Sequence, residues 1–268
     1  MNELLVGTSG WMYDDWRTRF YPGDVAKKRW LAYYGARFPT VENNNAFYRL
    51  PERDTFAGWK ASVPDGFVMA VKASRYLTHM KRLRDPAEPV RRLLRAAEGL
   101  GTALGPVLLQ LPPTLRGDPD RLAACLRAFP RGVPVAVEPR HPSWWTGDVR
   151  RVLEARGAAL VWADRLGRPQ GPLWATADWA YLRLHEGAAA PRPHYGDRAL
   201  GAWLDRLTEG GPFTRTFAYL NNDHGGAAVR DAERFRDLAA AAGLTAPSAP
   251  RAAVAGSRSP RRSSPVRR

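Results

Sequence analysis

The chain is poor in cysteine and in long apolar stretches. Cys125 is the only cysteine among 268 residues, which excludes an intrachain disulfide and a zinc site built from cysteines. No apolar run approaches the roughly 18 residues that a membrane helix requires, so we expect no membrane-spanning segment. Residues 1–7 carry neither a basic region nor a long apolar region, so we expect no secretory signal and a cytoplasmic protein.

Acidic residues are scarce relative to basic ones. Lys and Arg number 41 against 26 Asp and Glu, which gives a net charge of +15. A basic protein attracts nucleic acids and anionic metabolites through its long-range field. Arginine outnumbers lysine 36 to 5 and alanine is abundant, a bias also typical of a GC-rich genome. The charge alone therefore leaves open whether nucleic acid is a partner.

The C-terminal stretch differs in composition from the rest. Residues 243–268 contain six arginines, no acidic residue and almost no large apolar side chain. Such a segment cannot bury enough surface to offset its ordering entropy. We therefore predict two regions, a folded domain over residues 1–242 and a disordered tail rich in Arg, Ala, Pro and Ser over residues 243–268.

Within residues 1–242, eight short β-type runs alternate with helical patterns. The runs cover residues 4–8, 40–42, 67–72, 107–111, 133–138, 159–164, 180–185 and 216–221. Most are continuously apolar, as buried parallel strands are. The interval between residues 162 and 181 is short and rich in Pro and Gly, so we expect a degenerate or missing helix there. The pattern predicts an α/β fold, a single (β/α)8 TIM barrel.

Nearly every apolar run ends in a polar or ionisable residue, and in a barrel these ends meet at one mouth. We take as candidate catalytic residues Glu42, Lys72, Glu138, Asp164 and His185. As candidate binding residues we take Asn44, Gln110, Arg140, His141, Arg183, Asn221, Asn222 and Asp223.

Several chemistries fit these residue types. Glu42 and Glu138, on strands roughly across the barrel, suit general acid–base work or serve to hold an arginine. The carboxylates and histidines also match the ligands of divalent metals, but no metal-ligand spacing occurs in the sequence, and we assign no metal ligand and no cofactor. Lys72, Arg140 and Arg183 favour an anion, as does the start of the last helix after residues 221–226. Aromatic residues in the loops either stack on a ligand or pack as lids.

Motifs spread over residues 5 to about 240 carry a family resemblance. They are Gly7-Thr8-Ser9-Gly10-Trp11, Phe20-Tyr21-Pro22, Phe38-Pro39-Thr40-Val41-Glu42-Asn43-Asn44, Phe47-Tyr48-Arg49-Leu50-Pro51, Leu108-Leu109-Gln110-Leu111-Pro112-Pro113, Glu138-Pro139-Arg140-His141 with Ser143-Trp144, and Asn221-Asn222-Asp223. In this order they resemble the YecE-like proteins, the domain of unknown function 72. The resemblance implies a TIM barrel and no established reaction. The sequence departs from the family at Ala46, where a hydroxyl residue is common, and at Glu186, where a glycine usually follows the Arg-x-His motif.

These observations predict an enzyme that acts on an anionic small molecule, phosphorylated or sugar-containing, at the C-terminal mouth of the barrel. Two alternatives stay open. One is a protein that binds or processes nucleic acid through its basic surface and tail, and the other is a small-ligand binder without catalysis.

Overall fold

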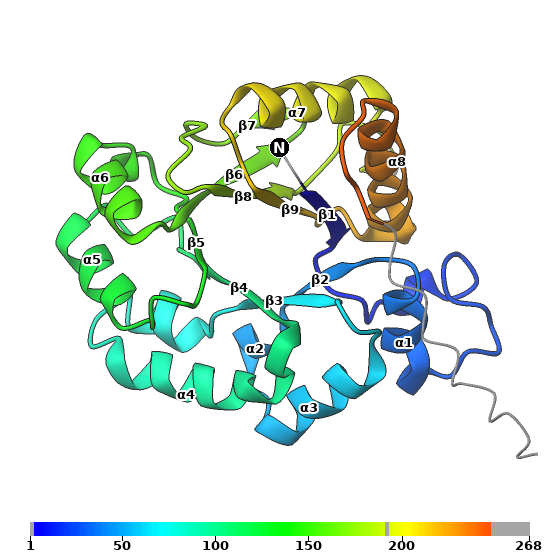
Figure 1. Cartoon of the computed structure of the whole chain (residues 1–268), viewed down its shortest axis with the longest axis horizontal. Helices are drawn as coiled ribbons and strands as arrows, with labels where there is room; N and C mark the ends of the chain where they lie inside the picture. The colour runs from blue at the N-terminus through cyan, green and yellow to red at the C-terminus, as the bar shows by residue number, and fades with distance from the viewer. Residues whose placement is uncertain (1–2, 191–192, 248–268) are drawn as a thin grey trace, which may run out of the picture.

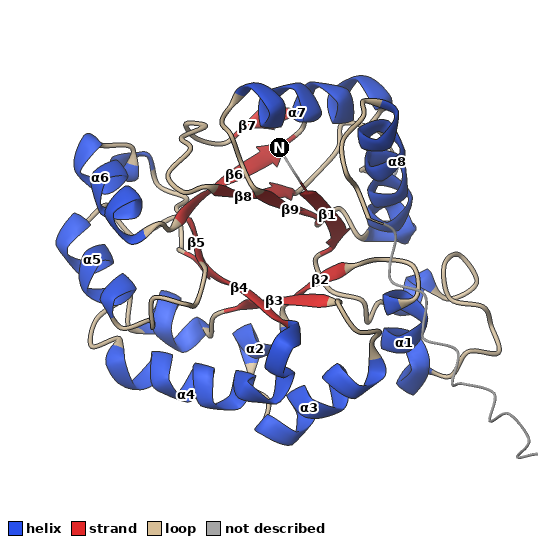
Figure 2. Cartoon of the chain, viewed as in Figure 1, coloured by secondary structure: helices blue, strands red, loops and turns tan. Residues whose placement is uncertain are grey.

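The computed structural model describes residues 3–190 and 193–247, and these form a barrel of parallel strands surrounded by helices (Figures 1 and 2). The barrel strands are β1 (Glu3–Thr8), β2 (Thr40–Asn43), β3 (Val68–Lys72), β4 (Leu104–Gln110), β5 (Val135–Glu138), β6 (Ala159–Arg165), β8 (Trp179–Leu184) and β9 (Arg215–Leu220). Each coincides with one of the eight predicted runs, so the predicted (β/α)8 barrel is confirmed.

Helices follow most strands along the chain and cover the outside of the barrel. They are α1 (Trp30–Gly35), α2 (Asn45–Tyr48), α3 (Arg53–Ser62), α4 (Ala87–Ala97), α5 (Pro119–Arg127), α6 (Gly147–Arg156), α7 (Asp197–Glu209) and α8 (Ala227–Ala241). Short helical turns lie at η1 (Asp14–Trp16), η2 (Lys27–Arg29), η3 (Tyr76–Met80), η4 (Glu98–Ala103), η5 (Pro142–Trp144) and η6 (His224–Gly226). None is long and apolar enough to cross a membrane, within the described part of the chain.

The crossover after β6 contains no helix. A two-residue strand, β7 (Arg168–Pro169), pairs antiparallel with β6, and irregular chain then leads to β8. The prediction of a missing helix between residues 162 and 181 is confirmed.

The wall is continuous from β2 through β3, β4, β5, β6, β8 and β9 to β1, and it closes loosely between β1 and β2. At this seam Ser9 and Glu42 form an isolated parallel bridge, and the Gly10 amide donates to the Glu42 carbonyl at 2.8 Å. Farther from the mouth, the Tyr34 hydroxyl bridges β1 and β2, which form no backbone hydrogen bonds with each other there. It accepts from the Thr8 amide at 2.8 Å and donates to the Thr40 carbonyl at 3.1 Å. The seam is thus held by side chains as much as by backbone.

Gly7 permits the close approach at the seam. A Cβ atom on Gly7 would lie 2.1 Å from the Thr40 carbonyl oxygen, a distance that no side chain tolerates. The glycine therefore allows β1 and β2 to come together where their backbones do not pair.

The barrel interior changes from apolar to polar along its axis. The lower layers hold a buried cluster of Leu5, Ala70, Leu108, Ala136, Ala159, Val161, Tyr181, Phe217 and Tyr219. Side chains point to alternate faces of a strand, so the next inward position on each strand lies nearer the C-terminal mouth. Those positions are polar on β3, β4, β5, β8 and β9, where Lys72, Gln110, Glu138, Arg183 and Asn221 follow, which places the candidate site above a packed apolar layer.

The folded chain extends past the predicted boundary at residue 242. Leu244 and Ala246 pack against the core, and the Leu4 amide donates to the Thr245 carbonyl at 2.8 Å. Residues 243–247 therefore contact β1 and belong with the barrel. The rest of the predicted tail, residues 248–268, lies outside the described residues.

Candidate functional site

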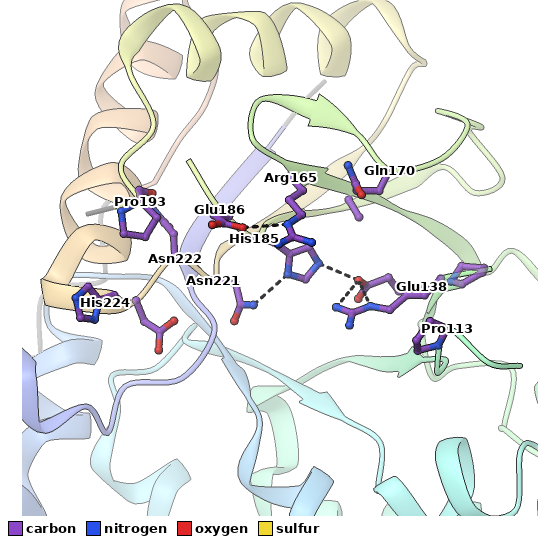
Figure 3. A pocket seen from close by; sticks show the side chains of 14 residues that line it. Pro113, Glu138, Arg165, Gln170, His185, Glu186, Pro193, Asn221, Asn222 and His224 are labelled. Carbon is purple, nitrogen blue, oxygen red and sulfur yellow. Dashed lines mark hydrogen bonds and ion pairs between the residues drawn. The ribbon is translucent and has the colours of Figure 1, made fainter. Parts of the chain in front are cut away.

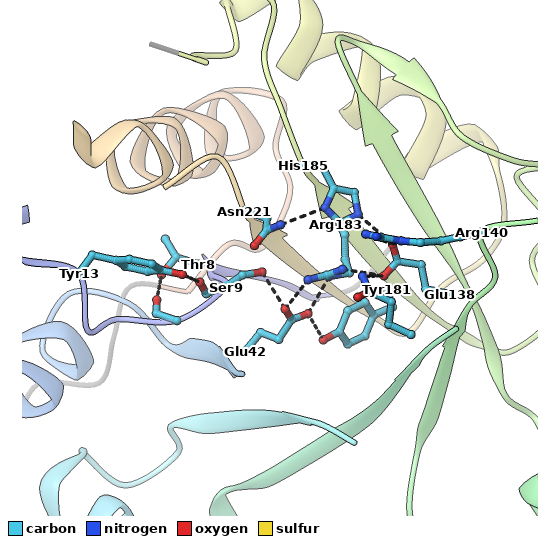
Figure 4. Close-up of polar contacts among 12 residues, drawn as sticks. Thr8, Ser9, Tyr13, Glu42, Glu138, Arg140, Tyr181, Arg183, His185 and Asn221 are labelled. Carbon is cyan, nitrogen blue, oxygen red and sulfur yellow. Dashed lines mark hydrogen bonds and ion pairs between the residues drawn. The ribbon is translucent and has the colours of Figure 1, made fainter. Parts of the chain in front are cut away.

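A ring of inward-facing polar side chains occupies the C-terminal end of the barrel (Figure 4). Glu42, Lys72 and Glu138 are the last or next-to-last residues of β2, β3 and β5, and Arg183 lies near the end of β8. Lys72, Glu138 and Arg183 are each two residues beyond a residue of the interior cluster, so strand alternation turns them toward the axis. Asn221 directly follows β9 and completes this group.

Arg183 joins the two glutamates beneath the mouth. Its Nε donates to Glu42 Oε2 at 2.9 Å and its Nη2 to Glu42 Oε1 at 2.7 Å. Its Nη1 donates to Glu138 Oε2 at 2.6 Å. The side chains of Arg183, Glu42 and Glu138 are only 1%, 0% and 2% exposed. We call these three residues the Glu–Arg–Glu network.

Further donors satisfy the two carboxylates. Ser9 Oγ and the Tyr181 hydroxyl donate to Glu42 at 2.8 and 2.7 Å. Gln110 Nε2 donates to Glu138 at 2.9 Å, and Arg140 approaches it at 3.4 Å. A buried ion pair is tolerated only when its remaining polar atoms are also bonded. The network meets that condition.

The electrostatic environment keeps both glutamates ionised. Burial by itself raises the pKa of the Glu42 carboxyl, but the Arg183 guanidinium outweighs burial and the pKa is lowered. The same opposition lowers the pKa of Glu138 well below its usual range, with His185 and Arg140 assisting Arg183. Both glutamates therefore act as acceptors.

His185 links the network to the cavity. Its Nε2 lies 2.9 Å from Glu138 Oε1, and because an ionised carboxylate only accepts, Nε2 carries the hydrogen. Its Nδ1 lies 3.0 Å from Asn221 Nδ2, which donates to it. The arrangement leaves Nδ1 as the accepting nitrogen, oriented by Glu138 from behind (Figure 3).

Two adjoining cavities open above the network. One, of about 560 Å³, is lined by residues that include Glu138, His185 and Glu186 (Figure 3). The other, of about 450 Å³, is lined by residues that include Lys72, Gln110 and Arg183. Arg140, Asn221 and Asp223 line both, so the cavities share a wall. Together they form a divided mouth.

Lys72 and Asp223 differ from the glutamates in their surroundings. Burial and the nearby Arg183 lower the pKa of Lys72 to about 8. Burial raises the pKa of the Asp223 carboxyl. Environments that push titratable groups in different directions are characteristic of acid–base sites.

Two candidate residues lie away from the mouth. Asp164 occupies the outward face of β6, where the Tyr195 hydroxyl donates to it at 2.5 Å and Trp203 Nε1 at 2.8 Å. Its neighbour Ala163 faces the cavity instead, as strand alternation requires. His141 accepts from the Ser143 amide at 3.2 Å and caps η5.

Asn222 lines the edge of the larger cavity but directs its amide to Asp231 Oδ2 at 2.6 Å. The helix start after it is also occupied, because the Gly225 amide donates to Asp15 Oδ2 at 2.6 Å. These contacts hold the last loop onto α8, and the Gly225 amide is not free for an anion.

The predicted loop aromatics separate into two groups. Trp11, Tyr13 and Tyr48 line the smaller cavity, and Tyr48 is 81% exposed. Trp16 and Trp144 are fully buried in the core, and the Tyr195 hydroxyl bonds to Asp164. Asn44 also lines the smaller cavity, where its buried Oδ1 has no hydrogen-bond partner in the described part of the chain.

The sequence analysis did not identify two residues that donate hydrogen bonds to the Glu–Arg–Glu network. Tyr181 sits inside an apolar run and reads as core, yet its hydroxyl reaches Glu42. Ser9 belongs to the first family motif but is not among the predicted site residues, although its hydroxyl also bonds Glu42. The available signal was spacing, since Tyr181 precedes Arg183 by two residues and shares its face.

The residues described offer no ready metal centre. Across residues 3–190 and 193–247, no group of three or more His, Cys, Asp or Glu side chains is arranged to hold a metal ion. Glu42 and Glu138 are instead bound to Arg183.

Similar proteins agree with the fold. A DUF72 family protein from Thermotoga maritima is 26% identical, with a TM-score of 0.78 over 88% of this chain and 99% of that one. A DUF72 family protein from Enterococcus faecalis V583 is 18% identical, with a TM-score of 0.73 over 88% and 94% of the two chains. A putative vitamin-B12 independent methionine synthase from Listeria monocytogenes shares the fold alone, at 13% identity and a TM-score of 0.51, over 89% and 96% of the chains.

No curated protein matches the sequence at a significant level. Residues 5–254 match the family described as "Protein of unknown function DUF72", which covers nearly the whole chain. The chain therefore belongs to the DUF72 family.

Proposed function

We propose that this protein is an enzyme that binds an anionic small molecule, phosphorylated or sugar-containing, at the mouth of the barrel. It removes a proton from that molecule. The observation that carries the proposal is that Lys72 and Arg140 direct cationic donors into the divided mouth while the charges beneath them are already paired. The Glu–Arg–Glu network forms the floor, and the two outer cations remain available to a ligand.

The hydrogen-bond inventory supports an anion. The Lys72 ammonium makes no hydrogen bond or ion pair with another described residue, although it carries three donors. Arg140 makes only 3.4 Å contacts to Glu138, and its side chain is 42% exposed. Charge-assisted bonds from such groups to phosphate or carboxylate oxygens are the strong ones.

Arg183 plays a different part. All three of its guanidinium nitrogens donate to carboxylates, and its side chain is 1% exposed. In this proposal it positions Glu42 and Glu138 and supports the ring above, rather than serving as the main anion contact.

His185 supplies the acid–base function. Glu138 holds its Nε2–H, so Nδ1 is the basic nitrogen, and Asn221 now occupies it. A ligand hydroxyl that displaces the Asn221 amide would meet Nδ1 within hydrogen-bond reach and give up its proton there. The exposed Tyr48 ring on the cavity lip would stack on a sugar ring.

Thermal shift with a ligand panel tests the proposal. The panel holds inorganic phosphate, sugar phosphates, the matching neutral sugars, nucleotides and a short DNA duplex. A ligand present at 100 times its Kd stabilises by about 2.7 kcal/mol, so an anionic ligand should raise the Tm by several degrees. Stabilisation by the duplex alone would favour nucleic acid, and a ligand that binds without turnover by NMR would mark a non-catalytic binder.

Matched variants locate the effect. Lys72→Met and Arg140→Met should each lose most of the ligand-induced shift. Lys60→Met and Arg150→Met should keep it, because Lys60 pairs with Asp65 and Arg150 lies on the outer helix α6 at a similar exposure of 49%. Equal shifts in all four variants would place the anion elsewhere.

A further inference from the structure

Lys72 lies at the wall of the smaller cavity and forms no salt bridge with a described residue. It ends β3, lines the smaller cavity and has no acidic partner within hydrogen-bond distance among the described residues. Its Nζ lies 4.2 Å from the centroid of the Phe47 ring, which packs against the side chain. The amine is therefore held at a cavity wall with its nitrogen open to a bound molecule.

We propose that Lys72 is a nucleophile that forms a covalent imine with an aldehyde or ketone substrate bearing an anionic group. The inference rests on the proposed function, since the anionic group binds in the same mouth, with Arg140 as the remaining cation. It adds the class of reacting group, a carbonyl, and the atom that attacks it, Lys72 Nζ.

The charges around Lys72 favour a neutral amine. Burial is the largest cause of the lowered Lys72 pKa, Arg183 and Arg140 lower it further, and Glu42 and Glu138 act in the opposite direction. With the pKa of Lys72 lowered to about 8, roughly a tenth of the amine is neutral at pH 7. An ordinary lysine with a pKa near 10.4 is neutral in only about 0.04% of molecules. Neutral amine is the form that attacks a carbonyl.

The Phe47 ring favours the protonated amine through its cation–π contact with Lys72 Nζ, and the other neighbouring groups add no further positive charge. His79, on η3, contacts Phe47 with ring centroids 5.1 Å apart. Burial lowers the pKa of His79, and Lys72 and Arg75 lower it further, so the imidazole adds no positive charge near neutral pH. Asp223 is the remaining carboxyl on the cavity wall.

The reaction balances without any oxidant or reductant. The Nζ lone pair forms a bond to the carbonyl carbon, and the carbonyl oxygen takes a proton as the nitrogen loses one, giving a carbinolamine. A second proton reaches that hydroxyl, water departs, and the nitrogen lone pair forms the C=N bond of the iminium. Asp223 suits the proton transfers, because burial raises its pKa while Glu42 and Glu138 stay ionised.

Reductive trapping on the wild-type chain tests the inference directly. The protein is incubated with pyruvate or glycolaldehyde phosphate and sodium cyanoborohydride, and the initial rate of adduct formation is measured at each lysine by peptide mass spectrometry. The chain has only five lysines, at positions 27, 28, 60, 72 and 81, so every site is resolved. We expect Lys72 to react at least tenfold faster than any other, with a rate that rises toward pH 8 and levels off above it.

Two controls separate this inference from the proposed function. Lys72→Arg should lose the fast adduct, whereas Lys60→Arg, at a surface ion pair with Asp65, should leave the adduct at Lys72 unchanged. Acetone, a neutral ketone, should trap poorly on wild type. If Lys72 reacts no faster than the other four lysines while anions still stabilise the protein, the nucleophile is refuted and the anion site stands. If acetone and pyruvate react equally fast at Lys72, the nucleophile stands and the anionic requirement fails.

Discussion

Replacing Arg183 by methionine removes the shared partner of two buried carboxylates. Methionine keeps much of the length of the side chain but offers no donor. Glu42 loses two of its four side-chain donor contacts and Glu138 loses its shortest, at 2.6 Å. Glu42 then has no ion-pair partner, and Glu138 keeps only Arg140 at 3.4 Å and the His185 hydrogen bond, while neither carboxylate is more than 2% exposed.

The expected loss of stability is large. Removing one member of a buried ion pair typically costs about 3–5 kcal/mol, whereas an exposed pair contributes about 0–1 kcal/mol. For a domain of this size that range corresponds to a Tm lower by roughly 6–20 °C. Arg140→Met is the matched control, since Arg140 contacts the same Glu138 at 3.4 Å but is 42% exposed. It should cost less than about 1 kcal/mol.

The cost should also depend on pH in a defined direction. In the wild type the pKa values of Glu42 and Glu138 are lowered, so their stabilising contribution is present above the unfolded pKa of about 4.3 and is lost as pH falls. Without Arg183, the largest interaction that opposes burial is gone, so both pKa values should rise. Acidification then favours the folded variant, and its deficit relative to wild type should shrink between pH 8 and pH 5.

Urea unfolding at both pH values measures this difference, and Glu42→Gln added to Arg183→Met should recover part of the loss, because it removes one unpaired charge. A deficit below about 1 kcal/mol, or one that stays constant with pH, would refute a charge-paired network.

Three further predictions concern other parts of the molecule. Glu138→Gln keeps the side-chain size but removes the charge that orients His185, so turnover of a substrate found in the ligand panel should fall by about 10²–10⁴-fold; an equal loss of affinity in titration calorimetry would assign Glu138 to binding instead. Truncation after Gly243 removes the Leu244 packing and the Leu4–Thr245 hydrogen bond and should lower the Tm by several degrees, whereas truncation after residue 247 should leave it unchanged; identical melting curves would contradict the packed terminus. Gly7→Ala places a Cβ against the Thr40 carbonyl and should destabilise by at least about 1–3 kcal/mol in urea unfolding, and a neutral result would mean that the seam adjusts.

The barrel could be predicted from sequence because its strands are short, buried and nearly continuously apolar. Buried parallel strands give a clear apolar signal, and the gap between residues 162 and 181 is too rich in Pro and Gly for a helix. Because the runs are continuously apolar, the sequence does not show which residues of a strand face inward and which face outward. Asp164 ends an apolar run like Glu138 does, yet it faces outward to Trp203.

The composition of the mouth could be predicted in part, but its pairing could not. Lys72, Arg140 and Asn221 do line the cavities, as strand-end residues in a barrel should. Arg183 pairs with two carboxylates because β2, β5 and β8 bring these side chains together across the barrel. No local sequence pattern predicts those distances. Tyr181 was hidden for the same reason, since its hydroxyl partner lies 139 residues away in the chain.

The seam between β1 and β2 gives the barrel wall a single joint, and that joint is anchored in the site. Glu42 pairs with Ser9 through its backbone and accepts from the Ser9 hydroxyl, while its carboxylate also binds Arg183. β1 pairs with β9 along its full length. Separating β1 from β2 therefore requires breaking the Ser9–Glu42 contacts and the Tyr34 hydrogen bonds, rather than a full set of backbone hydrogen bonds between two strands. The Glu42 carboxylate thus helps to hold β1 against β2 and also pairs with the buried Arg183 guanidinium. The same residue therefore contributes to the closure of the barrel and to the electrostatics of the mouth.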